Sequence, residues 1–71
     1  MTYKLTVIIP TYNAENYLLE AVNSIKEQSI GFENIELILV DDNSSDNTKV
    51  ILKELSQEHE NIKSIFLEGN S

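Results

Sequence analysis

The sequence predicts an α/β fold with a three-stranded parallel sheet, in the chain order β-α-β-α-β and the spatial order third, second, first. Three short apolar runs, rich in Val, Ile and Leu, predict the strands. Two longer stretches with apolar residues at helical spacing lie between them. Strands that alternate with helices require parallel pairing and right-handed crossovers. The arrangement is typical of half of a Rossmann-like sheet.

Residues 4–9 are predicted as the first strand, with Pro10 at its end because proline has no N–H to pair. Asn13 is a favourable cap for the first helix, and Glu15 in its first turn would be stabilised by the helix dipole. The inward stripe of this helix is predicted to consist of Ala14, Tyr17, Leu18, Ala21, Val22 and Ile25.

Residues 35–40 are predicted as the second strand, followed by Asp41-Asp42 and a polar loop. Asp46 or Ser45 is expected to cap the second helix, which ends before Asn61. Residues 62–67 form the predicted third strand, and residues 68–71 a turn. The inward stripe of the second helix is predicted to consist of Thr48, Ile51, Leu52, Leu55 and His59.

Length and composition exclude several functions. A chain of 71 residues has room for one small core. Twelve acidic residues against five lysines give a net charge of −7, which argues against binding of nucleic acid or of an anionic membrane. With no cysteine and one histidine, the chain has no disulfide, thiolate metal site or histidine cluster. The apolar run from Leu5 to Ile9 is too short for a signal-peptide core or a membrane span. The lack of cysteine fits a reducing cytosol, and we expect a cytoplasmic protein. A cytoplasmic membrane face is expected if a further segment carries an anchor.

Polar loops follow the first two strands, and in a parallel sheet these loops meet at the carboxyl edge, where ligands bind. An aromatic ring beside a carboxylate suits a nucleobase, because the ring stacks and the carboxylate accepts a base N–H. The start of the first helix is expected to lie near a phosphate. The side chains at this edge are Tyr12, Asn13, Asp41, Asp42, Ser44 and Asp46.

Two linked motifs in these regions resemble the start of the inverting family-2 glycosyltransferases with the GT-A fold. The first comprises residues 7–13, VIIPTYN, with 15–18, 24–25 and 28–29 after it. The second is residues 36–48, ELILVDDNSSDNT. The resemblance covers essentially the whole chain.

The resemblance implies transfer of a sugar from a nucleotide-diphosphate-sugar, typically a UDP-sugar, to an acceptor hydroxyl with inversion at the anomeric carbon. It implies that Pro10 approaches the base through its backbone, that Tyr12 packs on the uracil, and that Asp42 accepts the uracil N–H. The other candidates for the donor site are Glu15, which would line the pocket, Thr11 and Asp41.

Members of this family bridge the pyrophosphate with Mg²⁺ or Mn²⁺. They hold the metal with an Asp-x-Asp element after a fourth strand, and a later Asp or Glu is the general base. No residue of this chain is assigned as a metal ligand or a catalytic residue. We therefore expect residues 1–71 to be the N-terminal, nucleotide-binding portion of a GT-A domain, inactive by itself. Asn43 stands where many members have glycine.

Other interpretations of the same residues stay open. Tyr12 is alternatively a packing residue, Asp41 and Asp42 are alternatively turn residues, and Glu15 is alternatively placed by the helix dipole alone. The chain is alternatively a non-catalytic unit that binds nucleotide or associates with itself. An exposed first-strand edge favours such association, most simply as a homodimer.

Two further classes are disfavoured. A phospho-acceptor receiver domain should carry its acidic pair after the first strand, whereas here the pair follows the second. The spacing of Asp42, Ser44 and Asp46 mimics the start of an EF-hand loop. However, Asn47 replaces the required glycine and Lys53 the required glutamate, so calcium would bind weakly.

Overall fold

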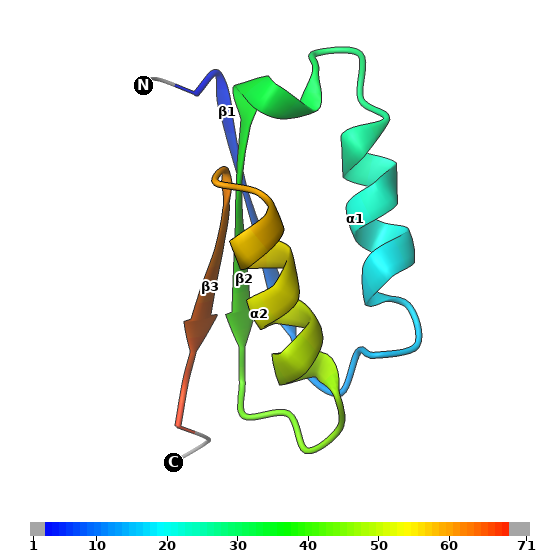
Figure 1. The fold of residues 1–71 in the computed structure, drawn as a ribbon, viewed down its shortest axis with the longest axis vertical. Helices are drawn as coiled ribbons and strands as arrows, with labels where there is room; N and C mark the ends of the chain where they lie inside the picture. Colours follow the sequence, from blue (N-terminus) through cyan, green and yellow to red (C-terminus); the bar gives the residue numbers. More distant parts are fainter. Residues whose placement is uncertain (1–2, 69–71) are drawn as a thin grey trace.

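The computed structural model describes residues 3–68. Its three strands, β1 (Leu5–Thr11), β2 (Ile35–Asp41) and β3 (Ile62–Phe66), form one parallel sheet in the order β1-β2-β3, with β2 in the centre (Figure 1). This confirms the predicted α/β class and strand order. The predicted terminal turn covers residues 68–71, and residues 69–71 of it lie outside the described residues. The other elements are α1 (Leu18–Lys26), the 3-10 helix η1 (Phe32–Asn34) and α2 (Thr48–Glu58).

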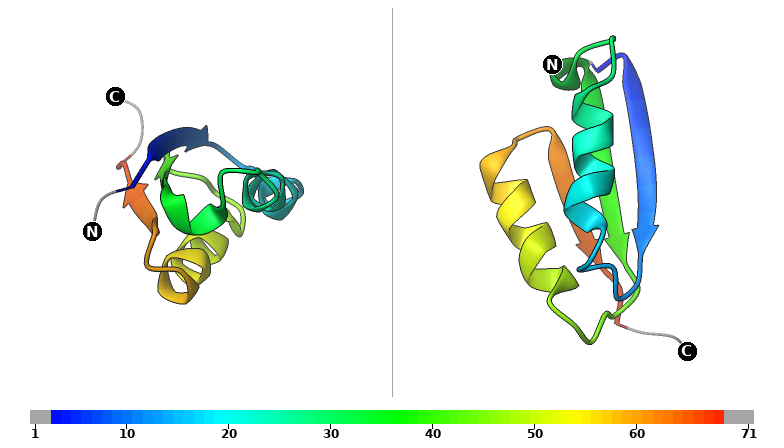
Figure 2. Two further views of the ribbon diagram at one scale, coloured as in Figure 1. Left: turned by 90° about the horizontal axis from the view of Figure 1, so that it is seen from above. Right: turned by 90° about the vertical axis from the view of Figure 1, so that its right-hand side faces the viewer.

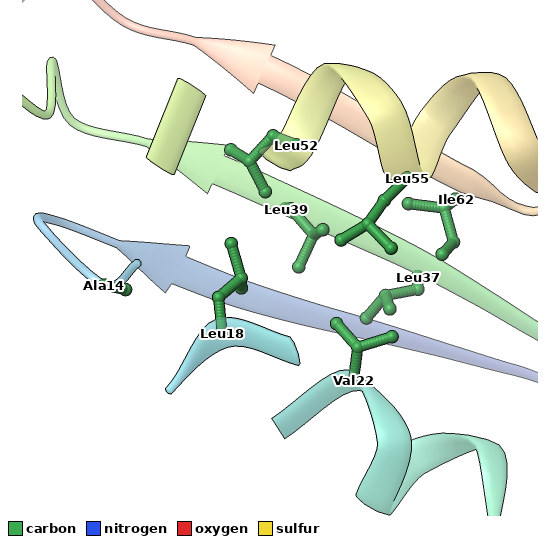
Figure 3. Packing of buried hydrophobic residues seen from close by; sticks show 8 residues of the cluster. All are labelled: Ala14, Leu18, Val22, Leu37, Leu39, Leu52, Leu55 and Ile62. Carbon is green, nitrogen blue, oxygen red and sulfur yellow. The ribbon is translucent and has the colours of Figure 1, made fainter. Parts of the chain in front are cut away.

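Both helices cover the same face of the sheet (Figure 2). Every second residue of β2 points into this layer, and Ile35, Leu37 and Leu39 are completely buried. Burying a large aliphatic side chain contributes about 1.5–3 kcal/mol. The layer between helices and sheet is therefore the main source of stability. Its central side chains are Ala14, Leu18, Val22, Leu37, Leu39, Leu52, Leu55 and Ile62 (Figure 3).

The opposite face of the sheet carries no helix within residues 3–68 (Figure 2). Ile8 on β1 is 63% exposed and Ile65 on β3 is 46% exposed. Between them on β2, Ile38 and Val40 are half-buried. An apolar surface is therefore open across all three strands, and β1 is an edge strand, as expected.

Pro10 lies inside β1 and does not end it, so the predicted strand end at residue 9 is wrong. The carbonyl of Thr11 accepts the N–H of Asp42 at 3.0 Å, which shows that the backbone of Thr11 faces β2. The nitrogen of Pro10, one residue earlier, faces the free edge, where a missing N–H costs no pairing. The strand therefore runs on to Thr11, directly before the polar loop.

The predicted start of the first helix at Asn13 is also wrong, because α1 begins at Leu18. Asn13 has a φ of +48°, and its side-chain oxygen accepts the N–H of Ser45 at 2.8 Å, so it does not cap the helix. A turn closed by the carbonyl of Ala14 leads into the helix. Tyr17 belongs to this turn and is 57% exposed, which corrects its predicted place on the inward stripe.

The residue directly before α2 is Asn47, whose side chain makes no capping hydrogen bond, so the predicted cap at Asp46 or Ser45 lies one or two residues too early. The carboxylate of Asp46 accepts the N–H of Thr48 at 2.9 Å, whereas the N–H and hydroxyl of Ser45 donate to the first loop. The predicted inward stripe of α2 is confirmed within the helix, where Thr48, Leu52 and Leu55 are buried and Ile51 packs against the core. The prediction is wrong for His59, which follows the end of α2 in an extended conformation.

The amino edge of the sheet is closed by contacts after α2. His59 packs edge-on against Phe32, with ring centroids 5.4 Å apart. The buried Asn61 donates from its amide to the carbonyls of Phe32 at 3.0 Å and Ile35 at 2.9 Å. Within residues 3–68, no helix has the length and apolar character needed to cross a membrane.

Candidate nucleotide site

The carboxyl ends of β1 and β2 meet at one edge of the sheet. Thr11 and Asp41 are partners in the pairing register, so the loops that follow them begin side by side with Tyr12 and Asp42. Tyr12 is 59% exposed, and Asp42 and Pro10 are exposed as well. The structure thus brings an aromatic ring and a carboxylate to the same edge, as the parallel topology predicted.

Asp41 differs from Asp42 in facing the interior. Its carboxylate is fully buried and accepts three hydrogen bonds. The donors are the Thr11 hydroxyl at 3.1 Å, the Ser44 N–H at 2.8 Å and the Ser44 hydroxyl. Thr11 is itself only 5% exposed. Of the acidic pair, Asp42 is therefore the carboxylate exposed to a ligand.

Side chains of the second loop bind the backbone of the first. The hydroxyl oxygen of Ser44 accepts the N–H of Asn13 at 2.8 Å, and that of Thr48 accepts the N–H of Ala14 at 2.8 Å. The expectation placed a phosphate beside a helix start directly after Asn13, whereas α1 begins at Leu18. The N–H groups of Asn13 and Ala14 already have protein acceptors, so they are not available to a phosphate.

Glu15 and the start of α2 form a second link between the loops. The N–H of Glu15 donates to the Asp46 carboxylate at 3.3 Å, and the Glu15 carboxylate accepts the N–H of Asn47 at 2.8 Å. Glu15 thus lies between the loops, and its side chain holds the turn that precedes α2.

Asn43 adopts the left-handed conformation, with a φ of +62°. Glycine adopts this conformation most readily, and asparagine is among the other residues that tolerate it. The side-chain oxygen of Asn43 also accepts a hydrogen bond from Lys49 Nζ at 2.7 Å. Asparagine at this position is therefore compatible with a loop in which glycine is common.

The residues of this edge do not fit a divalent metal. Within residues 3–68, no three histidine, cysteine, aspartate or glutamate residues are grouped so that they could hold an ion. The carboxylates of Asp41 and Asp46 accept hydrogen bonds from neighbouring protein groups.

Hydrogen bonds tune the carboxyl group of Asp46. Burial acts to raise its pKa, but the hydroxyl and N–H of Thr48, the N–H of Glu15 and its own N–H outweigh this, so the pKa lies below its ordinary value of 3.8. Asp46 should therefore stabilise the folded chain above pH 3.8, and this contribution should be lost as the pH falls from 3.8 through the lower folded-state pKa.

Urea unfolding of the natural chain and of Asp46→Asn, from neutral pH down to about pH 2.5, measures this contribution. We expect the natural chain to lose more stability than the variant as the pH falls below 3.8. If the free energy of unfolding fell equally with pH in the two proteins, the Asp46 carboxylate would not stabilise the fold in its ionised form.

Comparisons with known protein families and with individual proteins agree on one family. The sequence model described as "Glycosyl transferase family 2" matches residues 6–71. The minor teichoic acid biosynthesis protein GgaB of Bacillus subtilis (strain 168) is 54% identical over 59 residues, which is 83% of this chain and 7% of GgaB. The chain thus spans a small part of the curated relatives it matches, 7% of GgaB and 15% of GgaA.

Solved structures share the fold. S. aureus TarS (residues 1–349) in complex with UDP-GlcNAc has a TM-score of 0.79 and 38% identity, and the match covers 100% of this chain and 20% of that TarS chain. The mannosyltransferase PcManGT of Pyrobaculum calidifontis, in complex with GDP-Man and Mn²⁺, has a TM-score of 0.72 and 27% identity, and the match covers 100% of this chain and 21% of PcManGT. The three-stranded unit therefore corresponds to about a fifth of each of these two chains.

Proposed function

Because the chain belongs to glycosyl transferase family 2 and has the α/β fold of the N-terminal part of its GT-A domain, we propose that it is the nucleotide-binding part of a glycosyltransferase. The enzyme transfers a sugar from a UDP-sugar to an acceptor hydroxyl, with inversion at the anomeric carbon. The observation that carries this proposal is the position of exposed Tyr12 and exposed Asp42, which directly follow the register partners Thr11 and Asp41 at the carboxyl edge of the sheet. The UDP-GlcNAc complex of TarS supports the choice of donor.

Each exposed residue of the edge has a role in this proposal. Tyr12 is more than half exposed, so its ring is accessible to a ligand. In this proposal the ring packs on the face of the uracil. The carboxylate of Asp42 accepts the uracil N3–H in a charge-assisted hydrogen bond. Pro10 borders the base with its backbone, and Glu15 lines the pocket while it holds the two loops together.

The diphosphate and the metal are assigned to residues outside this chain. The Mn²⁺ in the PcManGT complex supports a requirement for Mn²⁺ or Mg²⁺ in the whole enzyme, where the ion neutralises the leaving diphosphate. The described residues supply no ligand set for such an ion and no assigned general base. We therefore propose that residues 1–71 are inactive alone. As a separate part of the proposal, the reaction takes place on the cytoplasmic side.

Titration with UDP, followed by NMR, tests the site. Shifts are expected to cluster at residues 10–15 and 41–44, and inorganic diphosphate alone should leave them unchanged. Affinity should be low for residues 1–71, because no metal site holds the diphosphate. Shifts confined to the amino edge, around Asn34 and Asn61, would contradict the assignment. A protein of natural length that binds UDP but transfers no sugar would favour the non-catalytic alternative.

We also propose that two copies of residues 1–71 associate through the uncovered face of the sheet or the free edge of β1. Exposed Ile8 and Ile65 would lose contact with water in such a dimer. Sedimentation equilibrium over a concentration series should detect the dimer, and Ile8→Lys should weaken it without unfolding the chain. A natural chain that stays monomeric at every concentration would contradict this part of the proposal.

A further inference from the structure

We propose that Asp41 is the positioning residue of the nucleotide site: its buried carboxylate fixes both Tyr12 and Asp42 without touching the nucleotide. The inference rests on the proposed function, in which Tyr12 and Asp42 contact the base. The network of hydrogen bonds around Asp41 reaches both residues by separate routes.

The first route leads to Tyr12 from both sides along the chain. Thr11, which precedes Tyr12, donates its hydroxyl directly to Asp41 at 3.1 Å. Asn13, which follows Tyr12, donates its N–H to the Ser44 oxygen at 2.8 Å, and the Ser44 hydroxyl donates in turn to Asp41. Both neighbours of Tyr12 are thus tied to one carboxylate, which restrains the backbone that carries the ring.

The second route leads to Asp42. The Asp41 carboxylate accepts the N–H of Ser44 at 2.8 Å, which closes a tight turn containing Asp42 and Asn43. Within this turn Asn43 is held at a φ of +62°, and the N–H of Asp42 donates to the carbonyl of Thr11 at 3.0 Å. The position of the Asp42 carboxylate is therefore set by a turn that Asp41 closes.

The network requires a carboxylate at this position. The Thr11 hydroxyl, the Ser44 N–H and the Ser44 hydroxyl all donate, and an ionised carboxylate accepts on both oxygens. Asparagine has nearly the same size but offers one acceptor oxygen and an NH₂ group. Asp41→Asn therefore places a donor against a donor at a site fully shielded from water.

The test uses the protein at its natural length and compares the dissociation constants of UDP and CDP. Uracil offers an N3–H to Asp42, whereas the N3 of cytosine carries no hydrogen, so a site built for that bond rejects CDP. In Asp41→Asn the UDP preference should fall about tenfold or more, because the Asp42 carboxylate loses its fixed position. A purely structural role would weaken both nucleotides equally and leave the ratio unchanged.

Asn61→Ala is the matched control. Asn61 is also buried and polar, and it makes two hydrogen bonds, but at the amino edge of the sheet. This variant should lower stability and leave the ratio of UDP to CDP affinity unchanged. If Asp41→Asn does not fold, Ser44→Ala replaces it, since it removes only the hydroxyl that links Asn13 to Asp41.

Amide hydrogen exchange without ligand separates failure of this inference from failure of the proposed function. In Asp41→Asn, the amides of Asn13, Asp42 and Ser44 should lose protection while those of Leu37 and Leu39 keep it. A natural protein that binds UDP and CDP equally would refute the proposed contact of Asp42 with the base, and the exchange pattern would still decide the role of Asp41. Unchanged protection of the loops, or an unchanged affinity ratio in a protein that prefers UDP, would overturn the inference.

Discussion

Replacing Leu52 with alanine is expected to lower the free energy of unfolding by about 2–5 kcal/mol. Leu52 is completely buried in α2 and lies in the layer between the helices and the sheet (Figure 3). Alanine would leave a cavity there, which a small core has little means of filling. Since small domains are stable by only about 5–15 kcal/mol, the variant should be close to the limit of folding. Urea unfolding followed by circular dichroism measures the loss.

Val50→Ala is the matched control, because Val50 lies in the same helix, is also aliphatic and is 54% exposed. We expect its effect to stay within about 0.5 kcal/mol. Similar losses in the two variants would contradict the packing of α2 against the sheet. If the Leu52→Ala variant shows no cooperative unfolding transition in urea, this result also represents the large loss of stability that we expect.

Asp42→Ala is expected to weaken UDP binding about 10- to 100-fold, which corresponds to a loss of about 1.5–3 kcal/mol for a hydrogen bond to a charged group. The physical reason is that, in the proposed site, the uracil N3–H loses its charged acceptor at an edge where the neighbouring carboxylate, Asp41, is buried and already bonded. Isothermal titration calorimetry on the protein at its natural length measures the change. The stability of the fold should change little, since the Asp42 side chain is exposed.

Glu33→Ala separates a specific contact from a change in net charge. Glu33 is exposed in η1, at the amino edge, and its removal changes the charge by the same amount. UDP should bind this variant as it binds the natural protein. Equal weakening in both variants, or full affinity in Asp42→Ala, would show that Asp42 is not the acceptor of the base N–H.

The sequence predicts the sheet well because the signals for it are local. Three apolar runs and two helical stripes, read with the handedness of crossovers, lead to the observed order of strands. The same order of strands places Tyr12 and Asp42 at one edge of the sheet, because the carboxyl ends of parallel strands lie at the same edge. The burial of Asp41 had a signal as well: strand alternation places it on the same face as Leu37 and Leu39.

The loops were predicted less well because their conformation depends on contacts distant in sequence. Asparagine is favoured both at helix caps and in the left-handed conformation, and nothing near Asn13 decides between the two. The decision comes from Ser45, which donates its N–H to the Asn13 side chain. The acceptor roles of Ser44 and Thr48 were missed for the same reason: both receive N–H groups from the other loop.

The hydrogen bonds between the two loops have a consequence for the kinetics of folding. They join residues 30 to 34 positions apart, and the register of β1 against β2 spans a similar interval, as in the pair Leu5 and Ile35. Contacts with such large sequence separation form slowly, because a long stretch of chain must be ordered first. During synthesis, Tyr12 would leave the ribosome early but reach its place only after Thr48 had followed. The proposed nucleotide site and the sheet should therefore form in one cooperative step, and a slip of one residue in the register would break every bond between the loops at once.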